Sequence, residues 1–386
     1  MRICLVYDCL FPWTVGGAER WYRNLAERLA AEGHEVTYLT RLQWNEDDRP
    51  AIPGVRVLAV SPRDDLYGPD GNRRIAPPLK FGLGVLRHLY RHGGDYDVVH
   101  TASFPYFSLL AAGCARRRHG FALVVDWHEV WSRHYWRSYL GRLGGAIGYA
   151  VQLTCVRLPQ RAFCFSRLHR DRLVAEGLRS TPEILEGEYA GDLAPPQPND
   201  AEPVVVFAGR HIREKRAPAV PPAIAAARHE APELRGVVFG DGPERPLVEQ
   251  AVRHAGIEDA VRVPGFVDHD ILDDALRTAL CMLLPSSREG YGMVVVEASA
   301  NGTPSIVVRG EDNAAVELVE DGVNGVVADS AEPKELARAI LRVQRAGRAL
   351  RESTCAWFAA NARRLSLEHS LQQVADAYAR WPSARS

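Results

Sequence analysis

Residues 283–298 have the sequence Leu-Leu-Pro-Ser-Ser-Arg-Glu-Gly-Tyr-Gly-Met-Val-Val-Val-Glu-Ala. The apolar start is typical of a β-strand, Gly290 and Gly292 mark a tight turn, and the run from Met293 predicts a helix. A helix that begins directly after a strand presents unpaired backbone N–H groups and the positive end of its dipole. The stretch therefore predicts an α/β fold with a strand end that could bind a phosphate or diphosphate.

Two glutamates bracket this turn. Glu289 precedes Gly290, and Glu297 lies on the first turns of the expected helix. Both carboxylates could accept hydrogen bonds from the hydroxyl groups of a ligand whose phosphate lies at the turn. The alternative is a strand-to-helix turn of structural importance only, with both carboxylates in solvent.

The same alternation of short apolar strands and longer helical patterns covers the chain and starts twice. The expected strands are 3–7, 36–40, 55–59, 98–100, 123–126 and 163–166, then 204–208, 236–239, 261–263, 280–284 and 305–308. The expected helices are 18–31, 79–91, 107–118, 143–156 and 167–176, then 219–229, 244–255, 271–278, 293–300 and 333–345. Two such series predict two Rossmann-like, doubly wound domains with parallel sheets.

A stretch rich in proline and small polar residues separates the two series. We expect an N-terminal domain over 1–190, a linker over 191–202 and a C-terminal domain over 203–365. Residues 366–386 are expected to form a C-terminal helix that packs back on the N-terminal domain. Ligands of open α/β sheets bind beyond the carboxyl ends of the strands, so two facing domains would share one interdomain cleft.

Composition narrows the class of protein. The chain has 386 residues, and 47 basic residues balance 48 acidic ones, which excludes the strongly basic signature of a nucleic-acid-binding protein. Seven scattered cysteines without a C-x-x-C pair indicate free thiols in a reducing cytoplasm. No apolar run is long enough for a signal peptide or a spanning helix. No basic amphipathic face stands out; peripheral membrane contact and the oligomeric state stay open.

A second motif follows the strand at 204–208. Gly209 and Arg210 come at its end, and Lys215 follows shortly after. Arginine supplies a planar fork of donors and lysine a compact charge, a pair suited to a diphosphate. Only three of the 47 basic residues are lysines, namely Lys80, Lys215 and Lys334. A lysine at a strand end in a chain that otherwise uses arginine suggests that arginine could not perform the function of this residue. The alternative is that the three lysines have no function and remain through neutral drift.

The N-terminal half offers further candidates. Gly16 and Gly17 open the helix after the first strand, and their bare backbone could lie opposite a diphosphate. His128 follows a strand and could donate to a sugar hydroxyl or stabilise charge at a reacting centre. Nearby aromatic residues could form a platform for an acceptor, or simply be core: Trp127, Trp131 and Tyr135, together with the more distant Trp13. The spacing of His128 and His134 does not favour a metal site.

Together these motifs resemble the family-4 glycosyltransferases. The resemblance rests on Gly16-Gly17-Ala18-Glu19, on Gly209-Arg210 with Lys215, on the Glu289 and Glu297 pair, and on Asp321-Gly322-Val323-Asn324-Gly325. It implies the GT-B fold, in which two Rossmann-like domains face a cleft. It also implies transfer of a hexose from a nucleotide sugar, such as a UDP- or GDP-sugar, to a hydroxyl acceptor, with retention of configuration and without a metal or cofactor.

The resemblance also implies roles for individual residues. Arg210 and Lys215 would bind the diphosphate, Glu289 the hexose hydroxyls and Glu297 the ribose. His128 would lie beside the sugar. The remaining donor contacts would come from Gly16, Gly17, Gly209, Gly290, Tyr291, Gly292, Met293 and Val294. We expect a front-face mechanism, because no further acidic residue is placed as a nucleophile.

Two departures and two alternatives remain. The family often has Lys-Gly where this chain has Lys215-Arg216, and Asn-Gly-Val-Asp where it has Glu186-Gly187-Glu188-Tyr189. A nucleotide-sugar epimerase of the same fold, or a nucleotide-sugar-binding protein without turnover, would carry the same motifs. The sequence does not name the base, the sugar or the acceptor, which could be a glycan, a glycolipid or a natural product.

Overall fold

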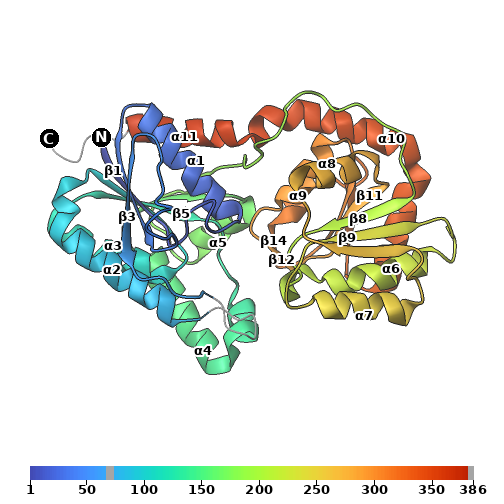
Figure 1. Cartoon of the computed structure of the whole chain (residues 1–386), viewed down its shortest axis with the longest axis horizontal. Coiled ribbons are helices and arrows are strands. Elements are labelled where there is room, and N and C mark those ends of the chain that lie inside the picture. The colour runs from blue at the N-terminus through green and yellow to red at the C-terminus, as the bar shows by residue number, and fades with distance from the viewer. Residues whose placement is uncertain (67–73, 381–386) are drawn as a thin grey trace. The chain divides into compact units, whose positions relative to one another are not determined.

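The computed structural model describes residues 1–66 and 74–380. The chain divides into two compact units (Figure 1). Unit 1 comprises Met1–Glu186 together with the C-terminal segment from Glu368, and unit 2 comprises Gly187–Leu367. Each unit is built around its own parallel sheet.

Unit 1 contains a seven-stranded sheet in the order β3-β2-β1-β4-β5-β6-β7, and every neighbouring pair is parallel. The strands are β1 (Arg2–Val6), β2 (Glu35–Arg41), β3 (Val55–Ser61), β4 (Val98–Ala102), β5 (Ala122–Trp127), β6 (Arg161–Cys164) and β7 (Glu183–Ile184). The central strands β1, β4 and β5 are buried almost throughout, as expected for parallel strands with both faces covered.

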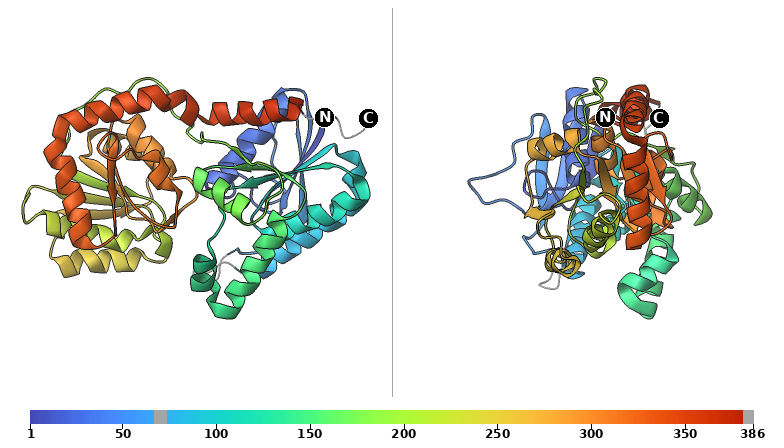
Figure 2. Two further views of the ribbon diagram at one scale, coloured as in Figure 1. Left: turned by 180° about the vertical axis from the view of Figure 1, so that it is seen from behind. Right: turned by 90° about the vertical axis from the view of Figure 1, so that its right-hand side faces the viewer.

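Helices cover this sheet. They are α1 (Gly17–Ala31), α2 (Ala76–His92), α3 (Tyr106–His119), α4 (Arg133–Val156), α5 (Arg167–Ala175) and the C-terminal α11 (Leu367–Arg380), with the short 3-10 helix η1 (Gly93–Asp95). Phe81 of α2, Leu109 of α3 and Trp136 of α4 belong to one hydrophobic cluster. The α11 helix lies beside α1, where Arg28 forms an ion pair with Glu368 (Figures 1 and 2).

Unit 2 contains a six-stranded parallel sheet in the order β10-β9-β8-β11-β13-β15 and a small β12-β14 pair. Its strands are β8 (Val204–Ala208), β9 (Arg235–Phe239), β10 (Val261–Gly265), β11 (Cys281–Leu284), β12 (Arg288–Glu289), β13 (Ser305–Val308), β14 (Asp312–Asn313) and β15 (Gly325–Ala328). Its helices are α6 (Val220–Ala227), α7 (Arg245–Ala255), α8 (His269–Thr278), α9 (Met293–Ala300) and α10 (Pro333–Leu365), with 3-10 helices η2 (Arg213–Lys215), η3 (Ala217–Ala219) and η4 (Ala314–Leu318). Two parallel α/β sheets confirm the predicted fold class.

Two helices are longer than the sequence indicated. The α4 helix begins at Arg133, not 143, because the Ser132 hydroxyl caps it by accepting from the Tyr135 N–H. Gly141 has non-helical backbone angles and interrupts the apolar period. Similarly, α10 extends to Leu365 past a non-helical Gly347. None of the described helices is long and apolar enough to cross a bilayer.

The chain enters and leaves unit 2 through adjacent segments. The Tyr189 N–H donates to the Leu365 carbonyl (3.0 Å), and the Leu367 N–H donates to the Tyr189 carbonyl (2.8 Å). A Cβ at Gly187 would lie 2.0 Å from the Ser366 carbonyl oxygen, so only glycine fits here. The segment 191–202, expected as the linker, follows as an irregular stretch within unit 2.

Candidate active site

The short strand β12 carries Glu289 into the interior of unit 2. Glu289 is buried, and its Oε1 accepts a hydrogen bond from the hydroxyl of Ser286, which is itself fully buried (2.7 Å). β12 pairs with β14, which sets Glu289 opposite Asn313. Because a carboxylate loses its hydration on burial, it needs a partner of opposite charge or several donors.

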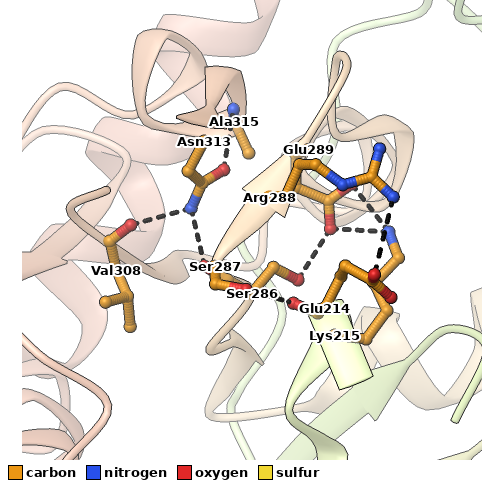
Figure 3. Close-up of polar contacts among 9 residues, drawn as sticks. All are labelled: Glu214, Lys215, Ser286, Ser287, Arg288, Glu289, Val308, Asn313 and Ala315. Carbon is orange, nitrogen blue, oxygen red and sulfur yellow. Dashed lines mark hydrogen bonds and ion pairs between the residues drawn. The ribbon is translucent and has the colours of Figure 1, made fainter. Parts of the chain in front are cut away.

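Lys215 supplies that charge. Its Nζ lies 2.6 Å from both carboxylate oxygens of Glu289, although the two residues are 74 positions apart (Figure 3). Lys215 ends the 3-10 helix η2, which follows β8, whereas Glu289 follows β11. The neighbouring strands β8 and β11 therefore bring together two residues that the sequence singled out separately.

Further contacts tie the two loops to each other. The Ser287 N–H donates to the Glu214 carbonyl (2.8 Å), and the Ser287 hydroxyl donates to the same oxygen (3.2 Å). The guanidinium of Arg288 lies 3.9 Å from the Glu214 carboxylate. Burial lowers the pKa of Arg288 to about 10, so this side chain remains charged at neutral pH. The loops after β8 and β11 thus form one hydrogen-bonded structure (Figure 3).

The side chain of Asn313 holds the loop after β11 through hydrogen bonds. Its amide nitrogen donates to the carbonyls of Ser286 (3.0 Å) and Val308 (2.7 Å), and its side-chain oxygen accepts from the Ala315 N–H (3.1 Å). Sequence reasoning missed both Ser286 and Asn313. A serine after the proline at a strand end, and an asparagine that forms a turn before a helix, were the available signals.

Gly292 begins the α9 helix in a conformation that only glycine adopts easily. Its φ is 108°, and a Cβ there would lie 2.6 Å from the Cβ of Ala315. No side chain caps α9, and Met293 and Val294 in its first turn are half-buried. Glu297, also half-buried, lies one turn further along α9. The preceding Tyr291 is buried, and Gly290 completes the turn.

The loop after β8 contains the other predicted cation. Arg210 is exposed, and its side chain forms no hydrogen bond or ion pair with any residue in the described ranges. Gly209 has only ordinary contacts, whereas a Cβ at Gly240 would lie 1.9 Å from the Gly209 carbonyl oxygen. The loops after β8 and β9 therefore approach closely because position 240 is glycine.

Arg216 explains one departure from the family pattern. Its backbone angles (φ 51°, ψ 34°) lie in the left-handed region, and in the described part of the chain no other non-glycine residue has a positive φ. A glycine would adopt this conformation without steric cost. The turn after Lys215 therefore carries an arginine in a conformation that suits glycine better.

In unit 1, His128 lies between aromatic rings. It stacks on Phe165, with ring centroids 4.4 Å apart and planes inclined by 11°. Its Nε2 is buried and has no hydrogen-bond partner among the described residues. Burial lowers the pKa of His128 to about 4, although Asp126 acts in the opposite direction. The imidazole is therefore neutral at pH 7, and its Nε2 is enclosed by the surrounding side chains.

A buried network lies next to His128. Asp126 accepts hydrogen bonds from the Trp21 indole N–H (2.8 Å) and from His100 Nε2 (2.7 Å). His100 Nδ1 lies 2.8 Å from the hydroxyl of Tyr378, which belongs to α11. Burial alone would raise the pKa of Asp126, but His100 and its other partners hold that pKa below its ordinary value. The C-terminal helix is thus connected to the end of β5, two residues before His128.

The N-terminal glycine turn is open. Gly16 precedes α1 with extended backbone angles, and Gly17 is the exposed first residue of the helix. A Cβ at Gly17 would meet no atom within 4 Å, so the fold itself does not demand glycine at this position. Close approach of a ligand would explain it.

The predicted acceptor residues have different environments. Trp127 is completely buried in the core, where its N–H donates to Gln160 (3.0 Å), and it has no exposed surface for an acceptor. Trp131 and Tyr135 are half-buried and in edge contact, with centroids 4.8 Å apart. Trp13 lies apart from them beside Trp44 and donates to Asp48 (2.8 Å). The predicted acceptor role of Trp127 is therefore wrong, because a fully buried side chain has no surface for a ligand.

The described residues contain no group of three or more His, Cys, Asp or Glu side chains placed to hold a metal ion. The polar groups of unit 2 are instead an ion pair, a free arginine among the described residues and the start of a helix. Such a set suits an anionic ligand that also carries hydroxyl groups. Metal independence stays a prediction.

Comparison with known proteins identifies the family. Residues 15–182 match the model of Glycosyltransferase Family 4, and residues 192–364 match that of the glycosyl transferases group 1. A D-inositol 3-phosphate glycosyltransferase of Nocardioides sp. is 33% identical over 402 residues, which cover 95% of this chain and 85% of that protein. The chain therefore belongs to the group 1, family-4 glycosyltransferases, which confirms the resemblance and makes it a retaining glycosyltransferase that uses a nucleotide sugar.

Solved structures agree on the fold. Sucrose-phosphate synthase from Thermosynechococcus elongatus superimposes with a TM-score of 0.78 at 19% identity, over 98% of both chains. The Anabaena protein HepE in complex with UDP superimposes with a TM-score of 0.73 at 18% identity, over 99% of this chain and all of that one. These likenesses confirm the GT-B fold.

Proposed function

We propose that this enzyme transfers a hexose from a UDP- or GDP-type sugar to a hydroxyl acceptor, with retention and without a metal ion. The observation that carries the proposal is the Lys215–Glu289 pair beside the uncapped start of α9. A lysine, a carboxylate and helix amides at the carboxyl ends of parallel strands match the diphosphate and the hydroxyl groups of such a donor.

Each part of the donor has a proposed partner. The diphosphate binds Lys215, Arg210 and the amides of Met293 and Val294, while Glu297 accepts from the ribose. The turn residues Gly290, Tyr291 and Gly292 shape this site together with Gly209, and Gly16 and Gly17 supply further backbone contacts. The UDP complex of HepE supports a UDP-type donor.

Glu289 is the proposed partner of the hexose hydroxyls. Ser286 and Lys215 occupy part of its carboxylate and fix its orientation. A carboxylate offers about four lone-pair positions, so acceptor capacity remains for a ligand. His128, neutral at pH 7, supplies a second hydrogen bond to the sugar from its unpartnered nitrogen.

The proposed reaction is a front-face displacement. The acceptor oxygen bonds to the anomeric carbon as the bond from that carbon to the diphosphate breaks, and the acceptor proton passes to the departing phosphate oxygen. Lys215, Arg210 and the α9 amides stabilise the negative charge that develops on the leaving group. The electrostatic attraction between a fixed cation and that oxygen is stronger in a buried site than in water.

The acceptor is proposed only by class: a glycan, a glycolipid or a natural product. Trp131 and Tyr135, with Trp13 as a weaker candidate, offer aromatic surface to a sugar ring or an apolar group. The Nocardioides relative, a D-inositol 3-phosphate glycosyltransferase, and sucrose-phosphate synthase both support a polyhydroxyl acceptor. We place the enzyme in the cytoplasm, because all seven cysteines are free thiols.

A ligand panel tests the proposal. Thermal shifts would be measured with UDP, GDP, TDP and ADP and with their sugars, and nucleotide release and sugar products would be measured alongside. A transferase releases nucleoside diphosphate and forms a glycoside in the presence of an acceptor. An epimeric nucleotide sugar without an acceptor would indicate the epimerase, and stabilisation without product the binding protein; either result overturns the proposal.

A further inference from the structure

The α2 helix has two apolar faces, of which one is exposed. Phe81, Val85 and Leu89 are buried against the core of unit 1. Leu79 and Leu83, four residues apart on another face, are exposed to 46% and 67%. A helix on the surface of a globular protein normally exposes polar side chains on that side.

The α4 helix repeats this pattern. Leu143 is exposed to 77% and Ile147 to 59%, and the exposed Tyr139 precedes Leu143 by four residues. The spacing of four aligns Leu143 and Ile147 along one side of the helix, whereas Tyr139 precedes the non-helical Gly141. Two helices of unit 1 thus expose a row of large apolar side chains.

Charge on these helices has one sign. The α2 and α4 helices contain no aspartate or glutamate, in a protein with 48 acidic residues. Their exposed cations are Lys80, Arg87 and Arg91 on α2, and Arg133, Arg137 and Arg142 on α4. Lys80 pairs with Asp64, but Arg137 and Arg142 form no ion pair within the described part of the chain. The positive charge of α4 is therefore largely uncompensated.

The two helices belong to one layer. Both pack against α3, and all three contribute to the same hydrophobic cluster on the sheet (Figure 1). The α3 helix between them also lacks acidic residues and ends in Arg116-Arg117-Arg118-His119. The absence of carboxylates thus extends across three consecutive helices of unit 1.

We propose that this layer, named here the α2/α4 surface, docks on the headgroup region of an anionic lipid bilayer. Leucine, isoleucine and tyrosine side chains interleaved with arginines hold a helix at such an interface, because the apolar groups enter it while the cations meet lipid phosphates. A second copy of the chain is a poor occupant, since two acid-free cationic surfaces would repel each other. The contact is peripheral, because no described helix can span the bilayer.

Vesicle flotation with the full chain tests the proposal, and it does not depend on the transfer reaction. The protein would be floated with phosphatidylcholine vesicles and with vesicles containing phosphatidylglycerol. We expect binding to the anionic vesicles only, weakened by added salt. Arg137→Gln with Arg142→Gln should weaken binding about fivefold for each arginine removed. Leu143→Glu with Ile147→Glu should abolish it.

The matched control is Ile271→Glu, because Ile271 on α8 of unit 2 is also exposed, to 53%. This variant should bind vesicles as the wild type does. Circular dichroism melts would show that each variant is folded. Equal binding to both kinds of vesicle, no binding at all, or normal binding by the Leu143→Glu, Ile147→Glu variant would overturn the proposal. So would a dimer in light scattering that this variant disrupts while vesicle binding is absent.

Discussion

Both units place candidate polar side chains at the ends of parallel strands, but the candidates in unit 2 are charged and His128 in unit 1 is neutral. Unit 2 holds a buried carboxylate against a lysine, with Nζ 2.6 Å from both oxygens. Unit 1 instead keeps His128 neutral, because burial lowers the pKa of that side chain to about 4. Under the proposed function, the cations that stabilise the leaving group all belong to unit 2, whereas the candidate residue of unit 1 is a neutral imidazole.

Replacement of Lys215 tests the role of the charged pair in unit 2, and we expect it to have the largest effect on turnover. Lys215→Ala removes a cation from the proposed diphosphate site and leaves Glu289 with the hydrogen bond from the Ser286 hydroxyl. We expect turnover to fall by about two to three orders of magnitude. Lys215→Arg should also lose most of the activity, because the longer, planar guanidinium does not fit a site where one nitrogen meets both oxygens.

The matched control is Lys334→Ala, which removes an exposed lysine on α10. Initial rates of donor consumption, with and without acceptor, would be measured for all three variants. A folded Lys215→Ala enzyme with the wild-type rate would exclude Lys215 from the diphosphate site.

Acidification tests whether His128 of unit 1 is held neutral. His128 has a pKa near 4 in the folded protein and about 6.5 when unfolded, so below pH 6.5 the unfolded chain binds more protons. Stability is therefore lost as the pH falls from 6.5 toward 4. At pH 5 the loss from this group is about 2 kcal/mol.

Urea unfolding at pH 7 and pH 5, followed by tryptophan fluorescence, measures this loss, since most of the tryptophans lie in unit 1. His128→Gln should remove about 2 kcal/mol of the difference between the two pH values. His88, whose pKa burial also lowers to about 4, contributes equally to wild type and variant. An unchanged pH dependence in the variant would show that His128 is not held neutral.

The two sheets were predictable because local physics determines them. Strands buried on both faces favour continuous apolar sequences, and β8, β11 and β1 after Arg2 have them. The predicted limits of α4 and α10 were wrong at Gly141 and Gly347, where the backbone leaves helical geometry but the helix continues on the other side. Hydrophobic periodicity cannot continue across such a break.

The site was predictable in part. Lys215 and Glu289 were recognisable as single residues, but their pairing follows from the adjacency of β8 and β11, which no local pattern encodes. Ser286 and Asn313 act through contacts with Glu289 and with distant carbonyls, so sequence spacing did not indicate them. No basic amphipathic face on α2 and α4 was recognisable in the sequence, because the exposure of Leu83 and Leu143 is apparent only in the packed structure.

A smaller effect tests how the network beside His128 depends on the C-terminal helix. Tyr378→Phe removes the hydroxyl that meets His100 Nδ1 and leaves a buried ring nitrogen without that partner. We expect the unfolding free energy of unit 1 to fall by about 1 kcal/mol. Tyr90→Phe, at an exposed tyrosine of α2, is the control, and equal stability of the two variants in urea would show that the Tyr378 hydroxyl is not structurally important.

The smallest expected effect concerns strain, which also distinguishes the units. The left-handed Arg216 lies next to Lys215 in unit 2, whereas no described non-glycine residue of unit 1 has a positive φ. Arg216→Gly relieves the steric cost of this conformation but adds freedom to the unfolded chain, so we expect a net gain of about 0.5–1 kcal/mol. Calorimetry should place the melting of unit 2 about 2 °C higher.

Arg216→Ala separates the backbone from the guanidinium. Alanine keeps the strained backbone and loses the charge, so it should not raise the melting temperature. If both variants keep the wild-type rate, position 216 has only a structural role. If both lose activity although only the glycine variant is more stable, then the guanidinium works beside Lys215 and its function offsets the strain. A lower melting temperature for Arg216→Gly would contradict the assignment of strain to this turn.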